Sequence, residues 1–468
     1  MKNLEERPLN KRDYFLVASL LFGLFFGAGN LIFPLHLGQL AGSNWGTAAL
    51  GFLVTAVVLP LLSVLAISVT HSEGVYDIGK PLGPAFALAF MILIHATIGP
   101  LFGTPRTATI PFSVGVQPLL PSGFEHAGLL VFSALFFGAA YLFSYKENRI
   151  MDSVGKALNP LFLVLLFVVF AFGFLSPMGS ASQQAVTKAY QNASFFNGFL
   201  EGYNTMDALA GLAFGVTVVT AVKGLGVRSA KRVSVVTARA GVLATGMIGL
   251  IYLGLILLGA SSLANYKVSA EGGTVFNQIV TYYMGGFGHA MLATLLTVTC
   301  LTTAIGLVAA FAQDFHKHFP KISYRAWLAF MCLASFLTAN FGLEQILAWS
   351  TPMLMFLYPF AMVLILLSLT SPLFHKDAAV YFFVVLFTAV PALLDMMAAF
   401  PAVVSQSAFA KTLASFQQYL PFASIGMDWV VPALVGLVIG LGVHFLRPVV
   451  AKNNVPTTAH NYMDTKVK

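Results

Sequence analysis

Charged side chains are scarce in this sequence. Only 9% of its 468 residues are Asp, Glu, Lys or Arg, and 58% are hydrophobic, whereas roughly 25% of the residues of an ordinary soluble domain are charged. This composition excludes an ordinary soluble fold. Since apolar runs of the ~20 residues that cross a bilayer recur along nearly the whole chain, we expect an all-α membrane protein that lies in the lipid bilayer without a separate soluble domain.

Sequence signatures of catalysis and of resident metals are also missing. The chain contains no HExxH, no GxSxG, no glycine-rich phosphate loop and no cluster of Cys and His. Its two cysteines, Cys300 and Cys332, lie inside apolar runs and lack the paired spacing of a zinc site. The loops are too short for the nucleotide-binding domain of a pump. We therefore expect no cofactor and no enzymatic activity, with a membrane-embedded enzyme as a remote alternative.

Long apolar runs, in contrast, are abundant. Because a helix needs ~20 residues to cross the hydrocarbon core, these runs predict about twelve transmembrane helices. The predicted spans lie at residues 14–41, 46–70, 83–113, 126–145, 154–175, 196–222, 233–262, 281–315, 324–341, 344–370, 378–400 and 429–447.

The positive charges test this topology independently, because Lys and Arg accumulate in cytoplasmic loops. All but four of the 25 Lys and Arg lie near the two termini or in even-numbered loops between spans. The exceptions are Lys188, Lys267 and Lys411 in odd-numbered loops, and Arg106 inside the third span. We therefore expect both termini in the cytoplasm. The net charge of +8 follows from this topology, and we predict no nucleic-acid partner.

Two of the predicted spans are interrupted at mid-depth by glycine or polar residues. Gly27, Ala28, Gly29 and Asn30 interrupt the first span, and the segment 201–207 interrupts the sixth. Backbone groups freed in lipid have no water to bond, so such breaks persist where they line a site. A helix-packing patch of small residues is the alternative for the first break, but the matching polar break in the sixth span makes it less favourable.

The two breaks open spans that are five apart. An odd number of spans inverts the second copy, so we expect two inverted repeats, at residues 14–175 and 196–370, each led by a broken helix. Residues 378–447 would add two peripheral helices, and residues 1–13 and 448–468 would be cytoplasmic tails. A carrier with six-plus-six symmetry would place its breaks six spans apart. The observed offset is typical of secondary transporters, whose substrate binds at the midplane.

The chemistry of the breaks suits a zwitterionic substrate. The amides at the start of a half-helix favour a carboxylate, and the exposed carbonyls at the end of one can hold a cation or an ammonium group. Glycine at positions 27 and 29 lets a ligand approach the main chain closely. A small amino acid supplies both charged groups.

Three ionisable residues in the spans are functional candidates, since charge is costly there. Asp207 and Glu201 could each bind a proton, a cation or the substrate amine, and Asp207 could instead cap the second half of the sixth span. For Arg106 we hypothesise an ion pair with Asp207 or Glu201 that gates or braces the site. The alternative is that Arg106 snorkels or bonds to carbonyls loosened around Pro100 and Pro105.

Four segments are similar to one known family. They read FFGAGNLIFP at 25–34, GPLFGTPRTAT at 99–109, NGFLEGYNTMDALAGLAFG at 197–215 and TCLTTAIGL at 299–307. The chain resembles the branched-chain amino acid:cation symporters, the BrnQ carriers, from about Asp13 to the twelfth span. That family is in turn similar to the carriers with the LeuT-like fold, which implies five-plus-five inverted repeats, broken helices 1 and 6, and alternating access.

The resemblance also implies ligand sets. A sodium ion would be held by main-chain carbonyls and hydroxyls, and the substrate by the two breaks. The implied sodium ligands are the carbonyls of Gly23, Phe26 and Thr299 and the hydroxyls of Thr302 and Thr303. The implied substrate residues are Gly27, Ala28 and Gly29 for the carboxylate, with Asn30 beside them, and Tyr203, Asn204, Thr205, Met206 and Asp207 for the amine and the side chain. Asn30 occupies the position of a second cation site in part of the LeuT-like group, whose other ligands have no clear counterpart here.

The resemblance then implies a symporter in a bacterial inner membrane that imports leucine, isoleucine and valine together with sodium. An apolar substrate side chain fits the sequence, since beyond Asp207 and Glu201 the breaks offer no charged residue to neutralise a charged one. The alternative is a proton-coupled carrier of another small neutral amino acid, because Asp207 and Glu201 could titrate.

Overall fold

The structure is a computed structural model that describes residues 9–146 and 159–446. Over these residues the chain folds into helices and connections, without a β-strand. The predicted C-terminal tail and the first residues of the predicted fifth span lie outside the described ranges. The all-helical fold class is confirmed.

The helices of the first predicted repeat follow the apolar runs closely. They are α1 (Lys11–Phe25), α2 (Ala28–Ala41), η1 (Gly42–Asn44), α3 (Trp45–Leu53), η2 (Val54–Val58), α4 (Leu59–Val69), α5 (Val75–Gly79), η3 (Lys80–Leu82), α6 (Pro84–Ala96), η4 (Thr97–Leu101), α7 (Gly103–Pro111), η5 (Phe112–Val116), η6 (Gln117–Leu119), α8 (Glu125–Ser144) and α10 (Asn159–Leu175).

The second predicted repeat and the last helices continue in the same way. They are η9 (Ala181–Gln183), α11 (Lys188–Asn192), α12 (Ser194–Glu201), η10 (Gly202–Thr205), α13 (Asp207–Ala213), α14 (Gly215–Gly224), α15 (Ala230–Ser262), α16 (Gly272–His318), α17 (Tyr324–Ala339), α18 (Leu343–Thr370), η11 (Ser371–Leu373), α19 (Ala378–Ala399), α20 (Ala402–Ser405), α21 (Ala408–Gln417), η12 (Ala423–Ile425) and α22 (Val430–Leu446).

Seven helical segments in the described ranges are long and apolar enough to cross a membrane, and the bent pair α13–α14 makes an eighth. One of the seven, Gly29–Val69, joins α2 to α4 and so covers parts of two predicted spans. The apolar helices α10, α17 and α22 are shorter. Each predicted run is mostly helical where it is described, and the count of twelve crossings stays a prediction.

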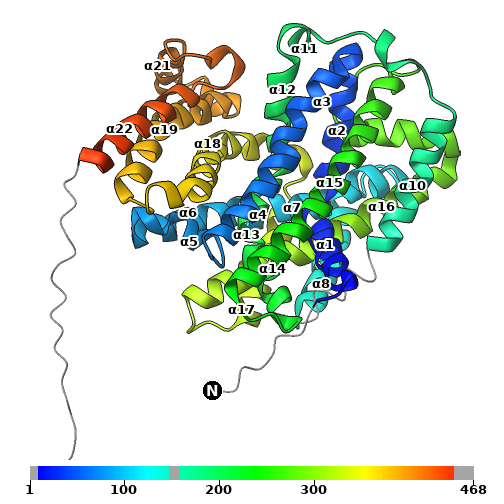
Figure 1. The fold of residues 1–468 in the computed structure, drawn as a ribbon. Helices are drawn as coiled ribbons and strands as arrows, with labels where there is room; N and C mark the ends of the chain where they lie inside the picture. The colour runs from blue at the N-terminus through cyan, green and yellow to red at the C-terminus, as the bar shows by residue number, and fades with distance from the viewer. Residues whose placement is uncertain (1–8, 147–158, 447–468) are drawn as a thin grey trace, which may run out of the picture.

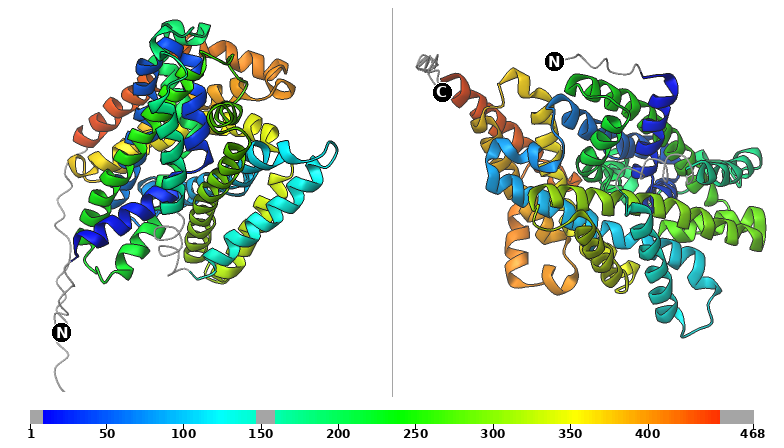
Figure 2. Two further views of the ribbon diagram at one scale, coloured as in Figure 1. Left: turned by 90° about the vertical axis from the view of Figure 1, so that its right-hand side faces the viewer. Right: turned by 90° about the horizontal axis from the view of Figure 1, so that it is seen from below.

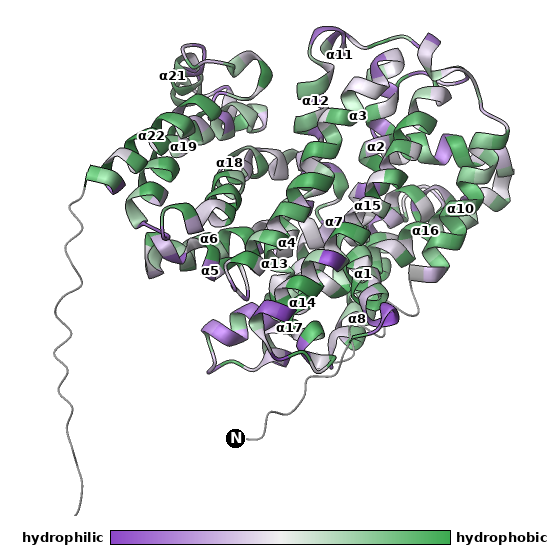
Figure 3. Cartoon of the chain, viewed as in Figure 1, coloured by the Kyte–Doolittle hydropathy of each residue, from purple (hydrophilic) through white to green (hydrophobic). Residues whose placement is uncertain are grey.

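Helices from the two predicted repeats are interleaved. α2 packs along α15, α1 packs on both α15 and α16, and α12 packs on α3. Figure 1 and the further views in Figure 2 show this bundle, with α19, α21 and α22 grouped at one edge, where α19 contacts α18. Hydrophobic residues cover most helices, and hydrophilic ones gather near α11, α14 and α17 (Figure 3). The last helices are therefore peripheral, as predicted.

Both predicted breaks are present. Between α1 and α2 the main chain is extended at Phe26 (φ −76°, ψ 95°) and Gly27 (φ −114°, ψ −167°). In the sixth span a short 3₁₀ turn, η10, ends at Met206, which has the left-handed φ of 61° before α13 begins. This conformation is uncommon for a residue with a side chain. Gly99 (φ −90°, ψ −126°) interrupts the third span next to Pro100, around which loosened carbonyls were expected in one interpretation, and Gly285 (φ 56°) kinks α16, which was not predicted.

Two glycines bring α2 and α15 to backbone distance. A Cβ on Gly38 would lie 2.1 Å from the Ile256 carbonyl oxygen, and a Cβ on Gly259 would lie 2.0 Å from the Leu35 carbonyl oxygen. Neither position has space for a side chain, so small residues set the distance between these helices. This packing brings Tyr252 of α15 to the break between α1 and α2.

An ion network joins three helix ends on the side predicted to be cytoplasmic. Glu73, between α4 and α5, accepts from Lys223 of α14 at 2.8 Å and from Lys317 of α16 at 2.7 Å. Hydrogen bonds from Lys223 and then Lys317 lower the pKa of Glu73 to about 2. The carboxylate therefore stays charged at any physiological pH.

We expect Glu73→Gln to lower stability modestly, because exposed ion pairs contribute only about 0.2–1 kcal/mol each and salt screens them. A depressed carboxyl pKa stabilises above the unfolded value of about 4.3, and this stabilisation is lost as the pH falls toward 2. Thermal midpoints of the detergent-solubilised protein at pH 7 and pH 3, in low and high salt, measure this effect, with Glu125→Gln as the control. A Glu73→Gln effect that persists in high salt would contradict this account.

Candidate functional site

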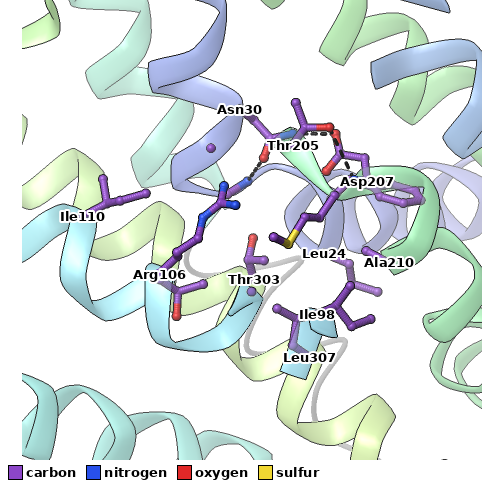
Figure 4. A pocket seen from close by; sticks show the side chains of 16 residues that line it. Leu24, Asn30, Ile98, Arg106, Ile110, Thr205, Asp207, Ala210, Thr303 and Leu307 are labelled. Carbon is purple, nitrogen blue, oxygen red and sulfur yellow. Dashed lines mark hydrogen bonds between the residues drawn. The ribbon is translucent and has the colours of Figure 1, made fainter. Parts of the chain in front are cut away.

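A small cavity lies where the two breaks meet α7 and α16. It measures about 40 Å³, which is room for water but far below the ~300–1,000 Å³ of a ligand pocket. Its lining divides into a polar side and an apolar side (Figure 4). The lining residues are Gly27, Gly29, Asn30, Gly103, Arg106, Thr107, Thr205, Asp207 and Thr303, and Leu24, Phe25, Ile98, Ile110, Met206, Ala210 and Leu307.

A buried hydrogen-bond network joins the two breaks at this cavity. Asn30 Nδ2 donates to Asp207 Oδ2 at 2.6 Å, and the Tyr252 hydroxyl donates to the same oxygen at 2.9 Å. Asn30 also bonds the Tyr252 hydroxyl, and its Oδ1 accepts from the Gly27 N–H at 2.8 Å. All three side chains are nearly inaccessible to solvent. The network thus ties spans one, six and seven together through one carboxyl group.

Asp207 occupies the first position of α13, where the free helix amides favour negative charge. Its main-chain N–H donates to Thr205 Oγ1 at 3.4 Å, while its carboxyl accepts the side-chain donors of Asn30 and Tyr252. Asp207 thus lies at the start of α13, where a capping residue is expected, and also lines the cavity, where a ligand-binding residue is expected.

Arg106 reaches the same cavity from α7. Its Nη2 donates to the Asn204 carbonyl at 2.7 Å, and its guanidinium lies 5.1 Å from the centre of the Phe33 ring. Within the described ranges Nη1 has no hydrogen-bond partner, although the side chain is 4% exposed. A Cβ on Gly29 would lie 3.1 Å from Arg106 Nη2, so glycine there leaves space for the guanidinium.

The hypothesised ion pair of Arg106 is not present. No described acidic side chain lies within 4 Å of its guanidinium nitrogens. Arg106 and Glu201 are joined indirectly, because Asn204 accepts from Arg106 with its carbonyl and donates with Nδ2 to Glu201 Oε2 at 3.2 Å. The alternative, a bond to a loosened carbonyl, is closer to the structure, but that carbonyl belongs to the sixth-span break and not to the surroundings of Pro100 and Pro105.

The implied sodium ligands are partly brought together. Thr303 Oγ1 lies 3.5 Å from the Gly23 carbonyl oxygen. In a continuous helix the Gly27 N–H would bond that carbonyl, but it donates to Asn30 Oδ1. The break thereby turns a main-chain oxygen of α1 into a potential ligand next to α16.

The other implied sodium ligands are oriented differently. Thr302 Oγ1 donates to the Thr299 carbonyl at 2.7 Å, and Thr299 Oγ1 donates to the Leu295 carbonyl at 2.7 Å. Phe26 leaves the helical conformation, which frees its carbonyl from the α1 hydrogen-bond ladder. Thr302 Oγ1 and the Thr299 carbonyl, both implied ligands, therefore lie 2.7 Å apart, and a donor set of oxygens alone is suited to a hard cation such as sodium.

Of the remaining predicted substrate residues, some line the small cavity and others do not. Thr205 and Met206 line the cavity, and Ala28 begins α2. Tyr203 is not among the lining residues and stacks on Tyr358 of α18, with 4.1 Å between ring centroids. Tyr252 and Phe33, which contact Asp207 and Arg106, were not predicted. A lone tyrosine in the seventh span is a weak signal, and Phe33 carries none.

A larger cavity of about 740 Å³ also reaches α7. Thr109 of α7 lines it, and the next residue in the chain, Ile110, lines the small cavity. Three carboxyl side chains, those of Glu125, Glu271 and Glu344, line the larger cavity. An acidic lining of this kind attracts cations and ammonium groups.

Comparison with known families decides the affiliation of the chain. A family model described as branched-chain amino acid transport protein matches residues 10–446. The chain belongs to this family. The predicted family is thus confirmed, and the carrier is a multi-pass membrane transport protein rather than an enzyme.

Curated relatives match the carrier over nearly its whole length. The branched-chain amino acid permease BrnQ of Lactobacillus delbrueckii subsp. lactis is 40% identical, with 92% of this chain and 96% of the relative covered. BraB of Bacillus subtilis is 39% identical, covering 93% and 96%, and BrnQ of Escherichia coli is 36% identical, covering 92% and 96%.

Two solved structures share the fold of the carrier. MhsT in complex with L-phenylalanine gives a TM-score of 0.54 at 16% identity, with 94% of this chain and 99% of that chain covered. Mhp1, a nucleobase-cation-symport-1 family transporter in a closed conformation with bromovinylhydantoin bound, gives 0.58 at 12% identity, covering 94% of each chain. The LeuT-like fold that the resemblance implied is confirmed.

Proposed function

We propose that this carrier is a symporter that imports leucine, isoleucine and valine by alternating access, driven by sodium. Membership in the family and the permease names of its relatives support the substrate class. The predicted cytoplasmic location of both termini in a bacterial inner membrane belongs to this proposal, as do the two inverted repeats at residues 14–175 and 196–370.

One observation supports substrate binding at the small cavity above all others. Arg106, with its unpaired Nη1, and Asp207 line the same buried cavity. An amino acid in this cavity would pair its carboxylate with Arg106 and with the amides that begin α2, and its ammonium group with Asp207. Asp207 retains capacity for this role, because an ionised carboxylate offers about four lone-pair positions.

The apolar side of the cavity fits an aliphatic side chain. Leu24, Ile98, Ile110 and Leu307 line it, and burying apolar surface against them contributes roughly 25 cal/mol per Å². This surface cannot separate leucine from valine strongly, since one methylene is worth only ~1–3 kcal/mol in an apolar pocket.

Alternating access is supported by the size of the cavity. At about 40 Å³ it is smaller than leucine, so the half-helices must move apart for the substrate to bind. Motion at the breaks requires little rearrangement of regular helix, because the α1–α2 and α12–α13 junctions already lack a continuous hydrogen-bond ladder. The larger acidic cavity beside α7 would serve as the vestibule through which the substrate reaches the site.

Sodium coupling is supported by Thr303 and the Gly23 carbonyl, which meet at 3.5 Å between the first and eighth spans. A cation bound there would link the two helices through neutral oxygens. The competing candidate is proton coupling through Asp207 or Glu201, which are the titratable carboxyl groups of the sixth-span break.

The test is uptake of labelled leucine into proteoliposomes under an inward gradient of sodium or of protons, imposed separately. We expect a sodium gradient to drive uptake in the wild type, and Thr302→Ala/Thr303→Ala to lower this uptake at least about tenfold, because hydroxyl ligands are lost. Thr297→Ala is a matched control, since its hydroxyl bonds within the same helix at the Ala293 carbonyl.

The outcomes separate the parts of the proposal. Uptake driven only by protons would reject sodium coupling and move the coupling role to Asp207 or Glu201. Competition by isoleucine and valine, but not by lysine or glutamate, is expected from the apolar lining. If leucine does not enter under either gradient, the substrate assignment is wrong, whereas the fold is unaffected.

A further inference from the structure

Two buried carboxyl groups share one hydrogen-bond donor at the edge of the molecule, outside the cavity described above. Asp395 belongs to α19, and Asp428 lies between η12 and α22; they are 9% and 0% exposed. The side-chain amide nitrogen of Gln417 donates to an oxygen of each carboxyl group, so the two groups lie side by side. Ionised carboxylates only accept hydrogen bonds, so neither of the two could donate to the other.

The surroundings provide little to neutralise two negative charges. Gln417, the last residue of α21, donates its amide to Asp395 Oδ1 and, at 3.4 Å, to Asp428 Oδ2. Asp428 Oδ1 is buried without a hydrogen-bond partner among the described residues. Lys411 of α21 is exposed, and no described cationic side chain forms a salt bridge with either carboxyl group.

A second buried group faces this pair from the sixth-span break. The Tyr203 hydroxyl, on a side chain that is 2% exposed, has no partner in the described part of the chain. It lies next to the indole N–H of Trp429 and close enough to Asp395 and Asp428 for their charges to act on it. Tyr203 belongs to the same sixth-span break as Asp207 and also stacks on Tyr358 of α18.

A proton accounts for this arrangement better than a metal ion does. Neighbouring buried carboxyl groups without a cation do not both ionise, and such a pair shares one proton. A metal ion would need several oxygen ligands, whereas Gln417 presents N–H donors to both carboxyl groups. Among the described residues no group of three His, Cys, Asp or Glu could hold a metal ion.

We propose that Asp395 and Asp428 bind one proton between them and form a proton site beside Tyr203 of the sixth-span break. The bound proton holds α19 against the segment that precedes α22. When it leaves, two negative charges repel each other in a buried site, and the peripheral helices loosen from the break.

A proton shared by Asp395 and Asp428 makes the free energy of unfolding depend on pH. Burial raises the pKa of Asp428 above its usual range, so the native protein keeps a proton that the unfolded chain releases above about pH 3.9. The stabilisation that this proton contributes is therefore largest at acid pH and is lost as the pH rises through the native pKa of the pair. Over that window one proton changes the unfolding equilibrium about tenfold per pH unit.

The experiment measures the thermal midpoint of the purified, detergent-solubilised carrier from pH 4.5 to 9, without substrate or gradient. Asp395→Asn, Asp428→Asn and the double variant are compared with the wild type, and Glu344→Gln, an exposed carboxyl, is the control. The side-chain amide of asparagine supplies an N–H donor in place of the protonated carboxyl group and does not titrate. We therefore expect each single variant to reduce the pH dependence of the thermal midpoint as much as the double variant does. The control should keep the wild-type slope.

Several results would overturn the site. If the double variant loses the sum of the pH dependences lost in the two single variants, the two carboxyl groups bind two independent protons. If neither single variant changes the pH dependence of the thermal midpoint, the pair binds no proton. A midpoint that depends on sodium at fixed pH, and loses this dependence in the variants, would mean a metal ion. If a variant does not fold, infrared spectra of the wild type decide, since a shared proton gives a protonated-carboxyl band that disappears at alkaline pH. Because none of these measurements involves transport, they stand apart from the proposed function.

Discussion

Asp207→Ala is expected to lower leucine uptake at least about 100-fold at an unchanged amount of protein in the membrane. The carboxyl group accepts hydrogen bonds from Asn30 and Tyr252 in a site closed to solvent. Its removal leaves the Tyr252 hydroxyl without its acceptor, takes one of the two acceptors of Asn30 Nδ2, and deletes the proposed partner of the substrate ammonium group. Removing one partner of a buried charged pair costs about 3–5 kcal/mol, and each 1.4 kcal/mol corresponds to about tenfold.

The measurement is the initial rate of uptake in proteoliposomes, normalised to the amount of reconstituted protein. Asp77→Asn is the matched control, because Asp77 lies in α5, far along the chain from the breaks and outside the cavity lining. Tyr252→Phe keeps the ring and removes one donor to Asp207, so we expect a smaller loss of about tenfold. Uptake by Asp207→Ala within tenfold of the wild type would mean that this network is dispensable.

Arg106→Ala is expected to have an effect of similar size for a different reason. The Asn204 carbonyl loses its donor, the Phe33 ring loses its cation, and the substrate carboxylate loses the free Nη1. We expect at least a 100-fold loss of leucine uptake. Arg106→Lys keeps the charge but lacks the planar fork that can serve the Asn204 carbonyl and a carboxylate together, so a loss of about tenfold is expected.

Competition by leucinamide distinguishes recognition of the substrate carboxylate by Arg106 from a purely structural role of Arg106. Leucinamide lacks the carboxylate, so it should compete with labelled leucine poorly in the wild type, and the preference for leucine should collapse in Arg106→Ala. Arg325→Ala is the control, because Arg325 stacks on Tyr145 at 4.3 Å outside the cavity. An unchanged preference in Arg106→Ala would remove Arg106 from substrate binding and leave it the role of holding the Asn204 carbonyl.

The sequence predicted the elements of the site better than their connections. Both breaks were correctly located, because glycine and polar residues inside an apolar run are a local signal that survives without tertiary information. Asp207 and Arg106 were singled out for the same reason. Their partners were not predicted: Arg106 bonds a carbonyl of Asn204, and every residue offers a carbonyl, so composition cannot indicate which one becomes available.

Other features had little or no sequence signal. Tyr252 contacts Asp207 because Gly38 and Gly259 let α2 and α15 approach at backbone distance, and this depends on two helices far apart in the chain. Thr302 donates to the Thr299 carbonyl, so two of the cation ligands that the resemblance implied lie together, and their role stays a prediction. Asp395 and Asp428 belong to different elements, and only packing of α19 against the segment before α22 makes them a pair.

The sequence by itself determined that this chain lies in a membrane, which residues fill its spans and where two of its helices break. These properties depend on the hydropathy and backbone chemistry of neighbouring residues. Only the tertiary structure decided which buried polar groups meet, such as Asp207 with Asn30 and Tyr252, or Arg106 with Asn204. The physical reason is that a buried charge is stabilised by whatever donors and acceptors the packing brings within about 3 Å, and packing joins residues that the chain keeps apart.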